Sequence, residues 1–417
     1  MSGLYIHIPF CASRCIYCGF YSTTLLRLQD DYVDALCKEM TMRQPTEPVQ
    51  TVYLGGGTPS LLSKKNLEKL FACIAMVYGH GTVLGNFQPN NTFKEITIEC
   101  NPDDVTEELA QELIALGINR VSIGAQTFSP RRLKFIHRRH TAEQIKQAVR
   151  NLRMAGFKNI SIDLMFGFPG ETLQEWIEDI REALALQVEH ISAYSLMYED
   201  NTPLTRLLKE GKIHEINDEL SLEMYKTLIE LLNESGYEQY EISNFAKLVE
   251  NPQKGEGRKT DSKTKRMSSS SEGVWDNRPV VASPFRSRHN SSYWHEIPYI
   301  GIGASAHSYD LKSRQWNIAD LRQYIQSIQS GKIPYEKETL DLNTRYDDLI
   351  TTALRTREGI DLKRMEAEYG KTLHDFLLKC AEPYLKLHDL KITDQQLSLT
   401  RGGLYISNEI MSDLMHV

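Results

Sequence analysis

The chain has 417 residues, of which 41% are hydrophobic and 25% charged, as is usual for a soluble globular protein. Its net charge of −7 argues against wholesale nucleic-acid binding. No run of about 18 apolar residues occurs, and the first residues lack the basic and apolar regions of a secretory signal. We therefore expect a cytoplasmic protein without an integral membrane segment, and peripheral association with a membrane stays open.

The first 247 residues alternate between strand patterns and helix patterns. Strands are expected over 4–8, 51–54, 95–100, 120–126, 159–166, 190–196 and 237–242. Helices are expected over 29–42, 64–78, 106–116, 142–155, 173–186 and 219–235. Such alternation predicts an α/β fold with a parallel sheet. About six units favour an incomplete parallel (β/α)6-type barrel over a closed eightfold one, with its chemistry at the carboxyl ends of the strands.

Three segments follow the predicted barrel of residues 1–247. Residues 248–284 are rich in Ser, Lys and Gly, which predicts a disordered insertion, with a basic binding loop as the alternative. Residues 285–317 contain a glycine-rich strand or turn that we expect to complete the core. Residues 318–417 hold helical patterns and a predicted two-stranded wing over 397–406, as in a winged-helix-like domain. Because no basic helix accompanies this wing, packing or docking is favoured over DNA binding.

Three cysteines near the start carry the strongest chemical signal. Cys11, Cys15 and Cys18 are spaced C-x3-C-x2-C directly after the first predicted strand. Three close thiolates suit a [4Fe–4S] cluster and leave one iron open for another ligand. A structural zinc site is the alternative, but zinc usually takes four ligands in paired motifs, and no second pair follows.

Other distinctive residues also follow predicted strands. Gly55–Pro59 can let backbone approach a ligand, although a tight turn explains such a run equally well. Glu99 and Gln126 end the next two strands. Asp163 lies inside an otherwise apolar strand, where a charge is costly unless it is paired. Each alone is a plausible structural residue, but successive strand ends together form a candidate site for an adenosine and a carboxylate.

Two histidines are candidate axial ligands of a heme. His289 stands in the segment HNSSYW with Tyr293 and Trp294, and a flat cofactor needs an axial ligand between aromatic walls. His307 follows the glycine-rich segment and is the second candidate. The alternative for His289 is a partly exposed loop residue, whereas His7, between apolar residues, is expected in the core.

These motifs together resemble the coproporphyrinogen III oxidase-like branch of the radical S-adenosylmethionine (SAM) superfamily. The resemblance is carried by YIHIPFC, the three-cysteine motif, GGGTP, DLMFGFP and GIGASAH, and it spans nearly the whole chain except the insertion. It implies that Cys11, Cys15 and Cys18 hold the cluster. It also implies a set of SAM contacts, namely Tyr5, Tyr17, Gly56, Gly57, Thr58, Glu99, Gln126, Arg138 and Asp163. Arg138 lies in the sequence Phe-Ile-His-Arg, a local departure from the family pattern.

Two departures separate this chain from the oxidase itself. The oxidase carries a fourth cysteine two residues after the third, and here that position is Phe20. The oxidase also has a longer segment before its cluster. Both departures, with the HNxxYW element, imply a heme chaperone that binds heme, a cluster and SAM and passes heme to an acceptor protein. The alternative is radical SAM decarboxylation of coproporphyrinogen III, and a nucleic-acid-binding regulator is the remote third hypothesis.

Overall fold

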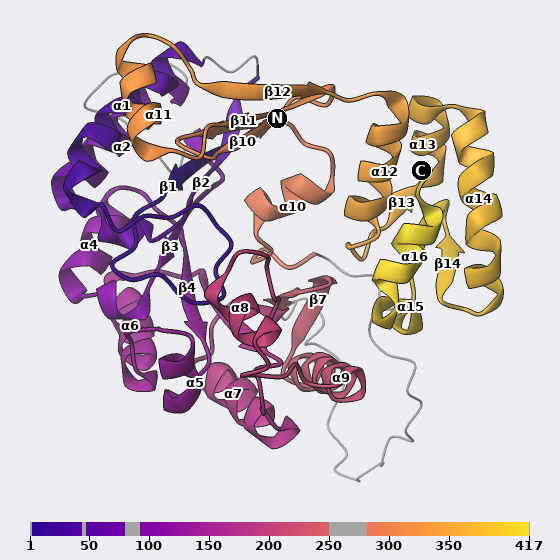
Figure 1. The fold of residues 1–417 in the computed structure, drawn as a ribbon. Helices are drawn as coiled ribbons and strands as arrows, with labels where there is room; N and C mark the ends of the chain where they lie inside the picture. Colours follow the sequence, from indigo (N-terminus) through magenta and orange to yellow (C-terminus); the bar gives the residue numbers. More distant parts are fainter. Residues whose placement is uncertain (1, 44–46, 80–91, 250–281, 417) are drawn as a thin grey trace, which may run out of the picture. The chain divides into compact units, whose positions relative to one another are not determined.

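The computed structural model describes residues 2–43, 47–79, 92–249 and 282–416 (Figure 1). The core of the predicted insertion, 250–281, lies outside these residues. Contacts divide the chain into two compact units, 1–228 with 287–345, and 229–286 with 346–417. The expected boundaries at residues 247, 284 and 317 stay predictions. Among the described residues, no helix is long and apolar enough to cross a bilayer.

The first unit is built on parallel strands that the sequence predicted well. The parallel strands are β1 (Ser2–Ile8), β2 (Val49–Gly56), β3 (Glu95–Cys100), β4 (Arg120–Gln126), β5 (Ile160–Phe166), β6 (His190–Ser195) and β9 (Tyr299–Ile302). They lie in the order β9-β1-β2-β3-β4-β5-β6. An antiparallel extension continues from β9 through β10 (His307–Tyr309), β11 (Ser313–Asn317) and β12 (Tyr335–Thr339). The predicted α/β class with an incomplete parallel barrel is confirmed.

Helices separate the parallel strands, and Figure 1 shows α1, α2, α4 and α6 along the outer side of the sheet. The helices that begin in this unit are α1 (Gln29–Met42), α2 (Lys64–Tyr78), α4 (Glu107–Ala115), α5 (Pro130–Phe135), α6 (Ala142–Ala155), α7 (Leu173–Ala185), α8 (Pro203–Lys209), α9 (Asp218–Glu234), α10 (Arg288–Trp294), α11 (Leu321–Gln329) and α12 (Leu342–Ala353). Short 3-10 helices cover Leu26–Leu28, Pro59–Leu61 and Pro102–Asp104. Capping boxes at Thr141 and Thr172 start α6 and α7, as Thr-x-x-Gln and Thr-x-x-Glu predict.

The strands have two chemically different faces. On β1, Leu4, Ile6 and Ile8 are fully buried on the face toward the helices. Tyr5 and His7 alternate with them and point to the inner face, where they bond to one another. The same alternation on later strands gives an apolar outer face and a polar inner face. A closed eightfold barrel instead fills its interior with branched apolar side chains.

The second unit has its own core and a small antiparallel sheet. Its strands are the hairpin β7 (Tyr237–Glu241) and β8 (Asn244–Lys247), and the sheet β13 (Ile360–Asp361), β15 (Gln396–Leu399) and β14 (Leu390–Thr393) in that order. Its remaining helices are α13 (Leu362–Tyr369), α14 (Lys371–Lys386), α15 (Arg401–Tyr405) and α16 (Ser407–Leu414). A continuous cluster of apolar side chains from residues 346–414 packs between them.

The predicted wing over 397–406 is wrong in its position. The strands β14 and β15 form the hairpin, and Asp394 and Gln395 form its turn. Both turn residues have positive φ (50° and 66°), as tight two-residue hairpin turns require. Gly402 and Gly403, which lie within the predicted wing, belong instead to α15, where the Thr400 side chain accepts a hydrogen bond from the Gly403 amide. One end of the predicted insertion is also structured, since Ser283 is buried and donates its amide to Glu238.

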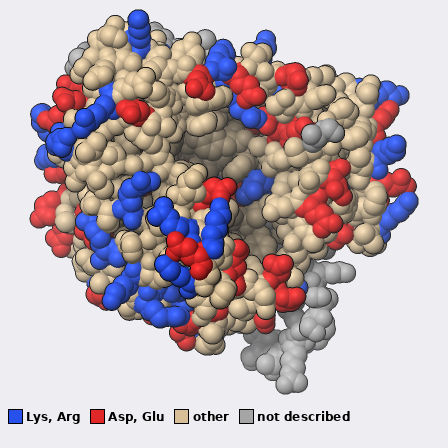
Figure 2. Space-filling model, viewed as in Figure 1, with Lys and Arg blue, Asp and Glu red and all other residues tan. Residues whose placement is uncertain are grey.

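The surface of the first unit carries both signs of charge. Figure 2 shows Lys and Arg side chains over α5, α6 and α8, with Asp and Glu among them. Arg131 pairs with Glu175 at 3.0 Å, and Arg150 pairs with Glu143 at 2.6 Å. Exposed pairs of this kind contribute at most about 1 kcal/mol each.

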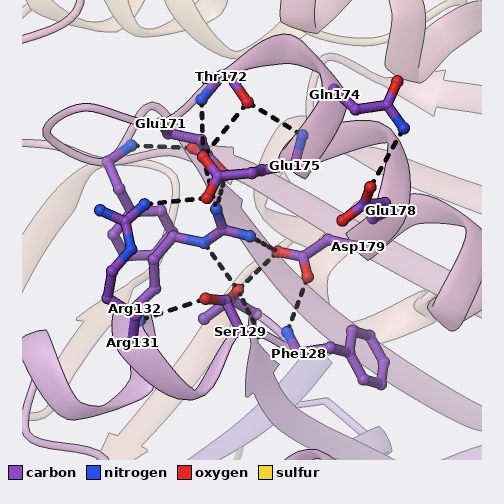
Figure 3. A network of polar contacts seen from close by, with 12 residues as sticks. Phe128, Ser129, Arg131, Arg132, Glu171, Thr172, Gln174, Glu175, Glu178 and Asp179 are labelled. Carbon is purple, nitrogen blue, oxygen red and sulfur yellow. Dashed lines mark hydrogen bonds and ion pairs between the residues drawn. The ribbon is translucent and has the colours of Figure 1, made fainter.

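A buried charge network fixes the loop that follows β5 (Figure 3). The Arg132 guanidinium on α5 lies 3.1 Å from Asp179 and 3.4 Å from Glu171, and donates to Thr127. Glu171 accepts the Gly167 and Phe168 amides at 2.7 and 3.0 Å. Burial raises the pKa of Glu171 to about 7 even beside Arg132. The loop geometry therefore depends on the buried Glu171 carboxylate, which accepts two loop amides and forms an ion pair with Arg132.

The floor of the barrel is closed by α10, which the sequence did not predict as a helix. The Glu95 carboxylate at the start of β3 accepts the amides of Arg288 and His289, both at 2.9 Å. His289 is 1% exposed, and its ring nitrogens bond to Thr51 Oγ1 at 2.9 Å and to the Tyr293 hydroxyl at 2.8 Å. Burial lowers the pKa of His289 to about 3, so the ring is neutral and one nitrogen donates while the other accepts.

A buried glutamate holds the antiparallel extension against α1. Glu39 accepts the Gly303 amide at 2.9 Å and the Tyr324 hydroxyl, and it also accepts from Asn317. Tyr32 on the same helix donates to the His7 carbonyl and accepts the Ala304 amide. The turn between β9 and β10, and with it His307, is thus tied to the parallel sheet.

Replacing Arg132 by Met should lower the free energy of unfolding by about 3–5 kcal/mol, because it leaves buried carboxylates without their partner. Arg131→Met is the matched control, since Arg131 is the neighbouring arginine, 63% exposed, and its loss should cost less than about 1 kcal/mol. Urea denaturation of both variants measures the difference. Equal small losses would show that the network does not stabilise the fold.

Replacing His289 by Ala should cost about 2–4 kcal/mol, because it opens a cavity and leaves the Thr51 and Tyr293 hydroxyls without their bonds. His295→Ala removes an exposed histidine from the end of the same segment and should change stability by less than about 0.5 kcal/mol. Thermal denaturation separates the two cases. A stable His289→Ala variant would contradict a structural role for this ring.

Candidate functional site

The loop that carries the three cysteines is fixed at its base and at its middle. At the base, the Cys11 amide donates to the Thr23 carbonyl at 2.9 Å, and the Thr23 amide donates back to the Pro9 carbonyl at 2.7 Å. In the middle, Ile16 is 5% exposed and packs in an apolar cluster with Ile136 and Leu204. Because Ile16 is buried, the thiols on either side of it are held at the end of the barrel where the strands terminate.

Cys11, Cys15 and Cys18 are half-buried free thiols that line one cavity of about 630 Å³. Burial raises the pKa of the Cys11 and Cys18 thiols. Among the described residues, no three His, Cys, Asp or Glu side chains converge on one point as ligands of a single ion would. A four-iron cluster does not need such convergence, because each thiolate binds a different iron. The three thiols on one loop fit a cluster better than a zinc ion.

The GGGTP turn passes directly over the start of the cysteine loop. A side chain at Gly56, with φ of 111°, would place its Cβ 2.4 Å from the His7 ring. A Cβ on Gly57 would lie 2.7–2.8 Å from the backbone of Pro9 and Ile8. Glycine is therefore required here by close backbone approach. Thr58, which follows, donates its hydroxyl to the Cys11 sulfur at 3.6 Å.

The strand-end carboxylates lie in the same cavity. Glu99 accepts the Tyr53 hydroxyl at 2.7 Å and the Gly56 amide at 3.1 Å. Burial raises the pKa of Glu99 to about 7. Asp163 accepts from Ser122 at 3.1 Å, and burial raises its pKa as well. Neither carboxylate has an ion-pair partner at short range, so both retain capacity to accept hydrogen bonds from a ligand.

Arg138 and Gln126 complete the cavity on the side of α5. Arg138 donates to the Tyr17 hydroxyl at 3.3 Å and to Asn101. Gln126 ends β4 with a φ of 65°, an uncommon conformation for a residue with a side chain, and lines the cavity. Arg138, the residue whose local sequence departed from the family pattern, therefore lies beside the cysteine loop.

The structure brings together most of the residues that the sequence analysis selected. The cavity is lined by all three cysteines and by Tyr17, Gly56, Gly57, Thr58, Glu99, Gln126, Arg138 and Asp163. Tyr5 is not among the lining residues; it is half-buried, and its hydroxyl bonds to the His7 ring. Sequence reasoning missed the lining residues Asn101, Arg120, Ser122, Ser192, Tyr194 and Asn290. For those on β4 and β6, strand parity was an available signal, since they share the inner face with the selected residues.

The candidate heme residues do not form one group. His289 is buried with both ring nitrogens bonded, as described above, while its neighbour Asn290 lines the cavity. Tyr293 packs edge-on against His289 and against Tyr299. His307 is exposed on β10 and stacks on Trp316 of β11, with ring centroids 6.0 Å apart. An axial role for His289 would require a break in its hydrogen bonds, whereas His307 is accessible.

Comparison with known proteins agrees with this architecture. The radical SAM superfamily matches residues 5–183, and the HemN C-terminal domain matches residues 340–406. Heme chaperone HemW of Bacillus subtilis is 32% identical over 98% of this chain and 98% of its own length. Heme chaperone HemW of Lactococcus lactis is 28% identical over 99% of this chain and 97% of its own length.

Among solved structures, coproporphyrinogen III oxidase (HemN) from Escherichia coli has the same fold. It aligns with a TM-score of 0.74 at 21% identity and covers 99% of this chain and 90% of its own. The fold, the clustered cysteines after β1 and the full-length similarity agree with one another. This chain belongs to the heme chaperone HemW family of the radical SAM superfamily.

Proposed function

We propose that this protein is a heme chaperone that binds heme, a [4Fe–4S] cluster and SAM, and passes heme to an acceptor protein. The relatives at 28–32% identity carry this name over nearly the whole chain. The observation that carries the proposal is Phe20. It is 69% exposed and lines the cavity at the position where the oxidase has its fourth cysteine. In this proposal, the protein has the radical SAM site but lacks the additional thiol of the oxidase.

Cys11, Cys15 and Cys18 are the proposed cluster ligands, and the GGGTP turn, Glu99, Gln126, Arg138 and Asp163 are the proposed SAM contacts. When bound, the cluster and SAM together supply one-electron chemistry. The role of this chain is to hold them in a cavity whose volume, about 630 Å³, is in the range of cofactor sites. Arg138 adds positive charge next to the thiols, which favours their ionised form.

The proposed heme contact is the exposed His307 together with the half-buried Trp316. Its two rings stack at 27° on neighbouring antiparallel strands, which presents an imidazole beside an indole face. A heme needs an axial ligand and an apolar surface for its ring. Partial desolvation of the ring, together with the nearby Arg314, lowers the pKa of His307 and so favours the neutral imidazole, the form that binds metal. The α10 residues are not part of this proposed contact, because His289 is buried and Tyr293 packs against His289 and Tyr299.

Glu99→Gln should weaken SAM binding by about 1–3 kcal/mol, because the cavity loses a charged acceptor for the ribose hydroxyls. Since burial raises the pKa of Glu99 to about 7, wild-type affinity should rise as the pH increases from 6 to 8, while the variant should show a flat profile. Asp200→Asn, an exposed carboxylate outside the cavity, is the control. Calorimetry across pH measures both effects, and an unchanged profile in Glu99→Gln would contradict the assignment.

The function itself is tested with anaerobically reconstituted protein. Heme should bind and give a Soret band, and His307→Ala should shift or weaken it, whereas His388→Ala should not. Incubation with SAM, an electron donor and coproporphyrinogen III should yield no protoporphyrinogen at enzymic rates. Formation of that product would establish the oxidase alternative instead. If heme binds but neither His307→Ala nor His289→Ala changes its spectrum, the chaperone proposal stands and the proposed heme position is wrong.

A further inference from the structure

An arginine inside the barrel has no hydrogen-bond or ion-pair partner among the residues that the structure describes. Arg120 opens β4 with its side chain on the inner face, and it lines the cavity while being only 1% exposed. Among the described residues, its guanidinium Nε and Nη1 are buried without a hydrogen-bond partner, and no carboxylate lies within 4.0 Å. Burial of an unpaired charge is costly, so a group that the protein itself does not supply must stabilise it.

The surface arginines of the same unit provide the contrast. Basic side chains over α5, α6 and α8 stand beside acidic ones (Figure 2), as in the Arg131 to Glu175 pair. The buried Arg132 also has its carboxylates. Arg120 lies within electrostatic range of Glu99 and Asp163, since it lowers the pKa of each. Both of these carboxylates are already engaged with other donors, and neither contacts Arg120.

A second group without a partner lies beside Arg120. Thr97 on β3 is the register partner of Arg120; its hydroxyl has no hydrogen-bond partner in the part of the chain that the structure describes, and it is fully buried behind the residues that line the cavity. Thr97 also faces inward, because it alternates with Ile96 and Ile98 on the apolar face. A guanidinium and a hydroxyl that are side by side, buried and unbonded form a donor set for an anion with two oxygens.

We propose that the floor of the cavity is a carboxylate subsite, in which Arg120 and Thr97 bind a carboxylate of the ligand that shares the cavity with SAM. This inference rests on the proposed function, in which that ligand is heme: one propionate enters the cavity, while the ring contacts His307 and Trp316, which are not among the residues that line it. In the proposed SAM site, the amino-acid end of SAM lies at the cluster, beside the GGGTP turn. Arg120 is the first residue of β4, and Gln126, a proposed SAM contact, is the last. Their backbones are therefore about 20 Å apart, at opposite ends of the strand.

The first test compares two buried arginines that carry the same substitution. If Arg120 has no protein partner, Arg120→Met should unfold at the same temperature as the ligand-free wild type or higher. Arg132→Met should unfold at a clearly lower temperature. A comparable loss of stability in Arg120→Met would show that Arg120 is a structural residue with internal partners, and would overturn the subsite.

The second test measures the carboxylate directly. Wild-type protein should bind heme at least tenfold more tightly than heme dimethyl ester. Arg120→Met should lose this preference, and Arg120→Lys should retain part of it. Arg150→Met, an exposed arginine, should leave the preference intact. Equal affinity of the wild type for the acid and the ester would contradict the subsite.

Two further arms identify the source of the carboxylate. If Arg120→Met weakens binding of SAM but not of decarboxylated SAM, the carboxylate is that of SAM and the proposal is wrong. If the wild type binds no heme at all, the chaperone proposal fails. Binding of free propionate then tests the carboxylate subsite independently of heme. Propionate should raise the melting temperature of wild type and leave that of Arg120→Met unchanged. No effect on either protein would refute the subsite.

Discussion

The structure depends on the opposite chemistry of the two faces of its parallel strands. The outer face is apolar and packs beneath the helices, so the sheet is held by hydrophobic burial. The inner face carries Tyr, His, Glu, Arg, Ser and Asp side chains, which cannot fill a barrel as branched apolar residues do. Each inward polar group needs a hydrogen-bond partner, and the need for these partners explains most of the remaining features of the first unit.

Protein groups satisfy part of this requirement. Glu95 accepts the first amides of α10, and His289 joins Thr51 to Tyr293, so one short helix provides partners for the floor of the barrel. Arg132 provides the same for the carboxylates around the loop after β5. In these places the buried charges and polar groups have partners within the protein, so they stabilise the fold.

The inward polar groups that lack a protein partner lie at or next to the cavity. Among the described residues, Arg120, which lines the cavity, and its buried neighbour Thr97 have no hydrogen-bond partner, and Glu99 and Asp163 have spare acceptor capacity. The difference between Arg132 and Arg120 is therefore informative, since both are buried arginines but only one is neutralised by the protein. The same reasoning corrects the emphasis on His289, whose ring nitrogens are used by the fold, and directs attention to the exposed His307.

The sequence by itself determined the parallel strands, most helices and the composition of the site. Helix and strand periodicities and capping residues are local, and Cys11, Cys15 and Cys18 are close along the chain. Only the tertiary structure decided the rest. The helix α10 depends on Glu95, nearly 200 residues away. The hairpin turn at Asp394 and Gln395 depends on positive φ at two residues that are not glycine, whereas the glycine pair Gly402 and Gly403 lies in a helix. That Arg120 lacks a partner is a property of its surroundings, and no local pattern encodes it.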